Sequence, residues 1–219
     1  MSESRILYSD TVMDSAQAQI HNRILQARPG AVFTPKDFLD LASRDAADQT
    51  LSRLVRQAKV RRLGRGLYYT PRHNETLGVD VPPDLDDVAD AVARQTGSRV
   101  APSGAVAANR LGLSTQVPVK PVYLSDGRTR QVAVGNYTLQ IKHVSPKDLP
   151  VGSRTSALVL QALRFLGKDA IHDGTIGAIR SALSRDDRAQ LLHDAQYATD
   201  WLREIVRRVA SESETVANG

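Results

Sequence analysis

The chain has 219 residues, of which 41% are hydrophobic, and a formal net charge of +5. This length suits one large or two small domains with an apolar core, and the absence of cysteine excludes disulfides, thiolate metal sites and cysteine nucleophiles. No apolar run reaches the roughly 20 residues of a membrane span, and the first residues lack a signal-peptide core, so we expect a cytoplasmic protein without a membrane partner.

The first expected element is a helix over Ser15 to Arg28. Its alanines and isoleucines recur on one face, and Pro29-Gly30 ends it. Ala31 to Phe33 is predicted as a short strand that pairs with a hairpin further along the chain.

Two short helices are expected next. Thr34 and Pro35 mark the start of the first, which runs to about Ala42, and Ser43 caps the second. Two helices joined by a tight turn, the second polar on its outer face, are typical of a helix-turn-helix whose second helix enters the major groove of DNA. The apolar face of that helix carries Ala47, Leu51, Leu54 and Val55, and the polar face carries Asp45, Gln49, Ser52, Arg53 and Arg56.

A hairpin follows the second helix. Val60 to Leu63 and Leu67 to Thr70 are its predicted strands, and Gly64-Arg65-Gly66 is a turn that tolerates positive φ. A hairpin in this place is the wing of a winged helix-turn-helix.

Basic residues gather on the end of the second helix and on the hairpin. Residues 34 to 73 hold nine Lys or Arg against four Asp or Glu, and this surplus of five equals the net charge of the whole chain. A solvated basic face or a protein-binding winged helix would be alternatives, but the coincidence with a helix-turn-helix favours DNA phosphates as the partner. The candidate DNA-binding residues are Arg44, Gln49, Ser52, Arg53, Arg56, Lys59, Arg61, Arg62 and Arg65.

The segment from Pro71 to Pro83 holds prolines and polar residues and is predicted to connect two domains. We therefore expect a DNA-binding domain over 1–80 and a second domain over 81–219. The predicted fold class is α+β, with the winged helix-turn-helix first and a mixed domain with a small antiparallel sheet and C-terminal helices second.

The second domain is predicted to begin with two helices, over Asp84 to Thr96 and from a Ser103 cap to Gly112. Three strands follow, and then four helices that reach almost to the end of the chain. The strands are expected at Pro121 to Ser125, Arg130 to Val134 and Tyr137 to His143, and the helices at 155–166, 175–183, 185–197 and 199–211. The last helix carries an apolar stripe, Trp201, Leu202, Ile205, Val206 and Val209, which we interpret as core rather than as a groove for a partner.

Three segments in this order resemble the AbiEi-like antitoxins of abortive-infection toxin-antitoxin systems. They are FTPKDFLDLASRDAADQTLSRLVRQAKVRRLGRGLYYTPR, PSGAVAANRLGLSTQVP and VYLSDGRTRQVAVGNYTLQIKH. The resemblance implies that the winged helix-turn-helix binds double-stranded DNA at repeated sites in the operon's own promoter, so that the protein is nucleoid-associated when bound. It also implies that the second domain neutralises a cognate nucleotidyltransferase-type toxin, often without a stable complex.

Two other hypotheses stay open: a plain winged-helix regulator with a partner- or ligand-sensing second domain, and a degenerate nuclease-like DNA-processing protein. For the latter, Asp126, Gln140 and Lys142 have the spacing of a metal-dependent nuclease core, but the second acidic residue is missing. The five histidines show no metal-ligand spacing, and the chain has no Gly-rich phosphate loop. We therefore expect no enzymatic activity, cofactor or metal.

Overall fold

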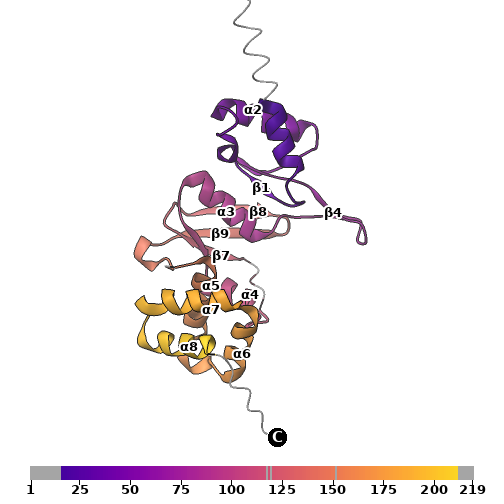
Figure 1. The fold of residues 1–219 in the computed structure, drawn as a ribbon. Coiled ribbons are helices and arrows are strands. Elements are labelled where there is room, and N and C mark those ends of the chain that lie inside the picture. Colours follow the sequence, from indigo (N-terminus) through magenta and orange to yellow (C-terminus); the bar gives the residue numbers. More distant parts are fainter. Residues whose placement is uncertain (1–15, 117, 119, 151, 212–219) are drawn as a thin grey trace, which may run out of the picture. The chain divides into compact units, whose positions relative to one another are not determined.

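The computed structural model describes residues 16–116, 118, 120–150 and 152–211 (Figure 1). The fold is mixed α and β, with several small sheets. The chain divides into two compact units, Met1–Val100 with Arg130–Gln140, and Ala101–Thr129 with Ile141–Gly219. These bounds differ from the expected domains 1–80 and 81–219, and a domain that folds alone over 1–80 stays a prediction.

Unit 1 begins with helical residues 16–25, followed by a 3-10 helix, η1 (Pro35–Phe38). The first helix ends before the expected Arg28, and its expected start at Ser15 lies outside the described residues. The expected helix from Pro35 to Ala42 is also shorter. The amides of Leu41 and Ala42 both bond to the Phe38 carbonyl, which closes a turn at the point where the helix would have continued.

Helix α2 (Arg44–Arg56) begins as the sequence predicts. The Ser43 hydroxyl accepts a hydrogen bond from the Ala46 amide at 3.3 Å, and this bond satisfies a free donor of the first turn. Its buried residues are Ala47, Thr50, Leu51 and Leu54. Ala47, Leu51 and Leu54 pack in one cluster with Ile20, Ile24, Phe33, Phe38, Val60 and Tyr68.

A three-stranded antiparallel sheet of order β1-β3-β2 completes this part of unit 1. Its strands are β1 (Val32–Phe33), β2 (Arg61–Gly64) and β3 (Leu67–Tyr69). The predicted pairing of the short strand with the hairpin is confirmed by the partners Val32↔Tyr69 and Phe33↔Tyr68. The turn between β2 and β3 has two residues, Arg65 and Gly66, because a bulge between Arg62 and Gly64 draws Gly64 into the strand.

The segment Pro71–Pro83 is not the plain connection that its prolines predict. It forms a hairpin of β4 (Arg72–Asn74) and β5 (Val79–Val81), which projects from the rest of unit 1 (Figure 1). The Asn74 side chain accepts a hydrogen bond from the Leu77 amide at 3.0 Å and thereby closes the turn. The two β-branched valines of β5 then favour an extended, paired strand over a loop.

Helix α3 (Leu85–Thr96) also belongs to unit 1. The Asp84 carboxylate caps it at the Asp86 amide, and it ends at Gly97 as predicted. Its fully buried residues are Val88, Ala89, Ala91 and Val92, whereas Leu85 and Ala93 are half-buried. Near its end, Arg94 pairs with Asp37 of η1 at 2.8 Å and donates to the Val32 carbonyl at 2.9 Å, which ties α3 to η1 and β1.

A four-stranded sheet of order β6-β7-β9-β8 contributes residues to both units. Its strands are β6 (Val100–Pro102), β7 (Val122–Ser125), β8 (Arg130–Val134) and β9 (Tyr137–His143). The three strands expected from alternating apolar residues are confirmed almost to the residue. Strand β6 was not expected, because three residues ending in proline carry too little pattern to predict a strand.

The helices of unit 2 are α4 (Gly104–Arg110), α5 (Arg154–Leu166), α6 (Asp173–Ala182), α7 (Arg185–Asp194) and α8 (Asp200–Ala210), with the 3-10 helices η2 (Pro146–Asp148), η3 (Lys168–Ala170) and η4 (Ala195–Tyr197). Ser103 precedes α4 in an extended conformation, but its side chain makes none of the expected capping bonds. Helix α7 ends at Asp194 rather than at residue 197, because the chain tightens there into η4.

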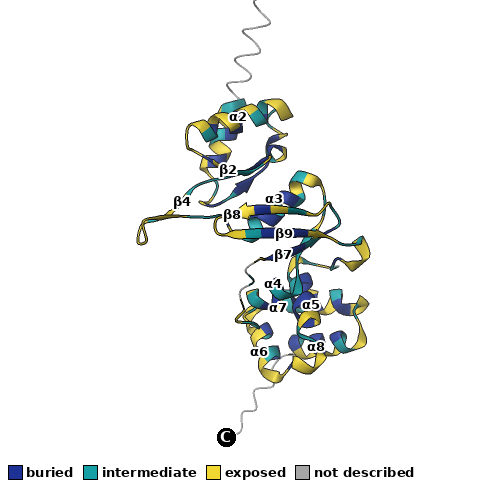
Figure 2. Ribbon diagram, turned by 180° about the vertical axis from the view of Figure 1, so that it is seen from behind, coloured by how far each residue is buried: buried dark blue, intermediate teal, exposed yellow. Residues whose placement is uncertain are grey.

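The apolar core of unit 2 joins the four C-terminal helices, whose buried residues are dark blue in Figure 2. In α8, Leu202, Ile205, Val206 and Val209 are buried in this core, with Trp201 packed against it. The interpretation of the stripe as core is therefore confirmed. None of the helices in the described part of the chain combines the length and the apolar character that crossing a membrane requires.

Candidate nucleic-acid interface

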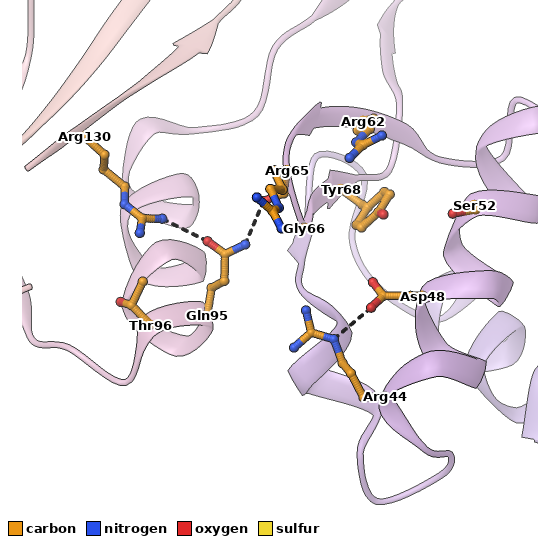
Figure 3. Close-up of a pocket in the computed structure, with 10 residues that line it drawn as sticks. All are labelled: Arg44, Asp48, Ser52, Arg62, Arg65, Gly66, Tyr68, Gln95, Thr96 and Arg130. Atoms are coloured by element: carbon orange, nitrogen blue, oxygen red, sulfur yellow. Dashed lines mark hydrogen bonds and ion pairs between the residues drawn. The ribbon is translucent and has the colours of Figure 1, made fainter. Parts of the chain in front are cut away.

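An open cavity of about 600 Å³ lies in unit 1 between α2 and the β2–β3 hairpin (Figure 3). The end of α3 and the first residue of β8 complete its wall. The residues that line it are Arg44, Asp48 and Ser52 of α2, Arg62, Arg65, Gly66 and Tyr68 of the hairpin, Gln95 and Thr96 of α3, and Arg130 of β8.

The charge of this lining is strongly positive. Four arginines against one aspartate leave a surplus of three positive charges. Arg44 Nε and Asp48 Oδ2 form an ion pair at 2.9 Å, but both side chains are more than 40% exposed, so the pair is worth only about 0–1 kcal/mol. An incoming anion can therefore compete for Arg44 at little cost.

The two hairpin arginines of the cavity have no ion pair with any described acidic side chain. Arg62 Nε donates to the Gly64 carbonyl at 3.2 Å, and Arg65 is exposed at the turn. Guanidinium groups without a carboxylate partner keep their N–H donors for a ligand.

Gln95 joins the hairpin turn to β8. Its Nε2 donates to the Arg65 carbonyl at 2.7 Å, and its Oε1 accepts from Arg130 Nη1 at 3.0 Å (Figure 3). Gly66 makes this approach possible, because a Cβ there would lie 2.5 Å from Gln95 Nε2. Gly66 also has φ +67°, a conformation that side chains other than glycine rarely adopt.

The structure places four of the predicted DNA-binding residues, Arg44, Ser52, Arg62 and Arg65, around this cavity. The remaining five lie elsewhere on unit 1. Gln49 and Arg56 are exposed on the outer side of α2, where Arg53 also lies and donates to Gln17. Lys59 Nζ is 3.0 Å from His21 Nε2. The predicted set therefore divides into a cavity group and an outer helix group, with Lys59 and Arg61 in neither.

Arg61 is turned away from its neighbour Arg62, since successive side chains of a strand point to opposite faces. It pairs with Asp80 of β5, which also accepts from His73 Nδ1 at 3.0 Å. The hydrogen bonds of His73 and of Arg61 hold the pKa of Asp80 below its ordinary value, and the bond to Asp80 raises the pKa of Arg61. Arg61 therefore faces Asp80 and does not line the cavity.

Sequence reasoning missed the part of the cavity wall formed by Gln95, Thr96 and Arg130. Gln95 and Thr96 fall in the last turn of a helix that was assigned to the second domain, and Arg130 opens a strand far along the chain. No local pattern distinguishes these residues, because their role depends on the packing of α3 and β8 against the hairpin. In the part of the chain that the structure describes, no group of three or more His, Asp or Glu side chains could hold a metal ion.

A family model described as a family of unknown function, DUF6088, matches residues 19–191. The match covers η1, α2, the β2–β3 hairpin and every residue that lines the cavity. No curated protein matches the chain. Because the matched residues make up well over half of its length, the chain belongs to the DUF6088 family.

Proposed function

We propose that this protein is a DNA-binding antitoxin that represses its own toxin-antitoxin operon through a winged helix-turn-helix. In this proposal η1 and α2 form the helix-turn-helix, and the β2–β3 hairpin forms the wing. The observation that carries it is the cationic cavity between α2 and the hairpin, where four arginines face one aspartate.

The outer face of α2 suits the major groove of DNA. Gln49 and Arg56 are exposed there, on a helix of 13 residues whose opposite face is buried in the core. Glutamine and arginine form paired hydrogen bonds with the edges of adenine and guanine. This face therefore supplies sequence readout, while the cavity arginines beside it supply phosphate contacts.

The neutralisation of a nucleotidyltransferase-type toxin rests on the resemblance to AbiEi-like antitoxins, which spans both units. We assign this neutralisation to unit 2, because the cationic cavity, which we assign to DNA, lies in unit 1. A gene for such a toxin beside this gene, and survival of cells that express both proteins, would support the assignment. Toxicity that persists when both are expressed would leave a plain DNA-binding regulator.

The DNA-binding proposal is tested on the full chain with two duplexes, the upstream region of its own gene and a random sequence of equal length. Binding is measured by fluorescence anisotropy over a series of salt concentrations. We expect tighter binding to the upstream duplex and a linear fall of log affinity with log salt. Failure to bind either duplex at low salt would overturn the proposal.

Gln49→Ala tests the role of the helix. Loss of one paired contact should cost about 1–3 kcal/mol on the upstream duplex and almost nothing on the random one. Gln26→Ala, which removes an exposed glutamine outside η1 and α2, serves as the control. Equal losses on both duplexes would show that α2 positions the protein without reading sequence.

A further inference from the structure

We propose that the cavity holds a phosphodiester group of the DNA backbone, and that Arg130 of β8 is a phosphate-binding residue of this site. The inference rests on the proposed DNA binding and extends the interface beyond the helix-turn-helix and the wing. A residue far along the chain thus joins the surface formed by η1, α2 and the hairpin.

The contacts of Arg130 favour this role. Its side chain is half-buried and makes one described hydrogen bond, from Nη1 to Gln95 Oε1 at 3.0 Å. A guanidinium has five N–H donors, so four are left for a ligand. Because Gln95 already orients the group, little side-chain freedom is lost when a phosphate binds.

The lining of the cavity selects the chemistry of its occupant. Four guanidinium groups and the hydroxyls of Ser52 and Tyr68 offer hydrogen-bond donors, and few apolar atoms are available to hold an uncharged ligand. Arginine forks match the paired oxygens of a phosphate. The cavity is open rather than enclosed, which suits one segment of a long backbone better than a small molecule that must be surrounded.

Gln95 links Arg130 to the hairpin turn through two hydrogen bonds. The same amide that accepts from Arg130 donates to the Arg65 carbonyl, so the two arginines are held on one scaffold (Figure 3). Because Gln95 lies between the two residues in Figure 3, the phosphate would bind beside this amide, held by Arg130 and by the exposed side chain of Arg65.

The experiment compares full-length Arg130→Ala, Arg130→Lys and Arg128→Ala. Arg128 is an exposed arginine close by in sequence that does not line the cavity, so its variant removes the same charge. Affinity for the upstream and the random duplex is measured over a series of salt concentrations, and circular dichroism confirms that each variant folds.

We expect Arg130→Ala to weaken binding to both duplexes by about tenfold and to flatten the slope of log affinity against log salt by about 0.9, the value for one phosphate. Arg130→Lys should keep the slope, because it keeps the charge, and lose only part of the affinity. Arg128→Ala should keep both.

If Arg130→Ala and Arg128→Ala had the same affinity and the same salt slope, the phosphate site at Arg130 would be overturned. The affinity of the wild type for DNA would still support the proposed function. If the wild type bound neither duplex, the proposed function and this site would fall together. Arg130-dependent binding of inorganic pyrophosphate, with DNA affinity unchanged in Arg130→Ala, would also overturn the assignment and give the cavity to a free anion.

Discussion

Arginines on the cavity side of unit 1 and on helix α8 of unit 2 have different surroundings. On α8, Arg203 pairs with Asp200, Arg207 with Glu204, and Arg208 with Asp173. On the hairpin, neither Arg62 nor Arg65 has an ion pair with a described acidic side chain. The arginines of α8 therefore have acidic partners, whereas Arg62 and Arg65 have none among the described residues, and a count of basic residues does not separate the two cases.

The same contrast exists between neighbours on one strand. Arg61 pairs with Asp80 of β5, while Arg62 turns to the cavity. The acidic residue that neutralises Arg61 lies on the β4–β5 hairpin, the segment whose prolines indicate a mere connection. Double variants that remove two arginines from the hairpin or two from α8 test whether this difference in surroundings decides the affinity for DNA.

The largest effect is expected from the double variant Arg62→Ala/Arg65→Ala. Loss of two phosphate contacts should weaken binding to any duplex by about 100-fold at low salt and flatten the salt slope by about two. The control is Arg203→Ala/Arg207→Ala, which removes two charges that are already paired in unit 2. Similar losses of DNA affinity in both double variants would mean that the affinity depends on net charge alone, and that the surroundings of the arginines do not matter.

Gly66→Ala should destabilise unit 1. The new Cβ would meet Gln95 Nε2, and the residue would keep an unfavourable φ of +67°, so we expect a loss of about 2 kcal/mol in the free energy of unfolding. Urea unfolding measures it. Gly64→Ala is the matched control, because a Cβ at Gly64 has no neighbour within 4 Å. A Gly66→Ala protein as stable as the Gly64→Ala protein would contradict the close approach of Gln95.

Asp194 gives unit 2 a pH-dependent contact. Its side chain is 8% exposed. Burial alone would raise its pKa, but hydrogen bonds from Ser153, Ser156, Gln190 and His193 outweigh this effect and lower the pKa to about 2. Because the pKa is lower in the folded state, the contribution to stability is complete above the ordinary aspartate pKa of about 4 and is lost as the pH falls toward 2.

We expect Asp194→Asn to lower the free energy of unfolding at pH 7 by about 1–2 kcal/mol, after allowance for solvent screening. The difference from the wild type should shrink between about pH 4 and pH 2. Asp169→Asn, at an exposed position of η3, is the control. A difference that stayed constant over this pH range would exclude ionisation of Asp194 as its cause.

The smallest effect is expected from Arg61→Ala. Because this arginine pairs with Asp80 and does not line the cavity, its removal should change DNA affinity by less than about threefold and leave the salt slope nearly unchanged. The variant Asp80→Asn provides the opposite test, since it frees Arg61 and should strengthen binding to any duplex. If Arg61→Ala lost as much DNA affinity as Arg65→Ala, Arg61 would have to be counted among the DNA-binding residues.

The local elements could be predicted from the sequence by itself, because their determinants lie within a few residues of one another. The Ser43 cap and the apolar spacing of α2, and the alternation in β7, β8 and β9, predicted helices and strands close to the observed bounds. The surplus of basic residues over 34 to 73 indicated which part of the chain carries the positive charge. It could not predict which of these charges remain unpaired.

The pairing of charges was decided by the tertiary structure. Asp80 reaches Arg61 only because the segment after Pro71 folds back as a hairpin, and Gln95 reaches both Arg65 and Arg130 only because α3 and β8 pack beside the turn. A charge is neutralised or exposed by neighbours a few ångströms away in space, whatever their separation along the chain. Sequence patterns over short windows could therefore not identify the residues that complete the cavity wall.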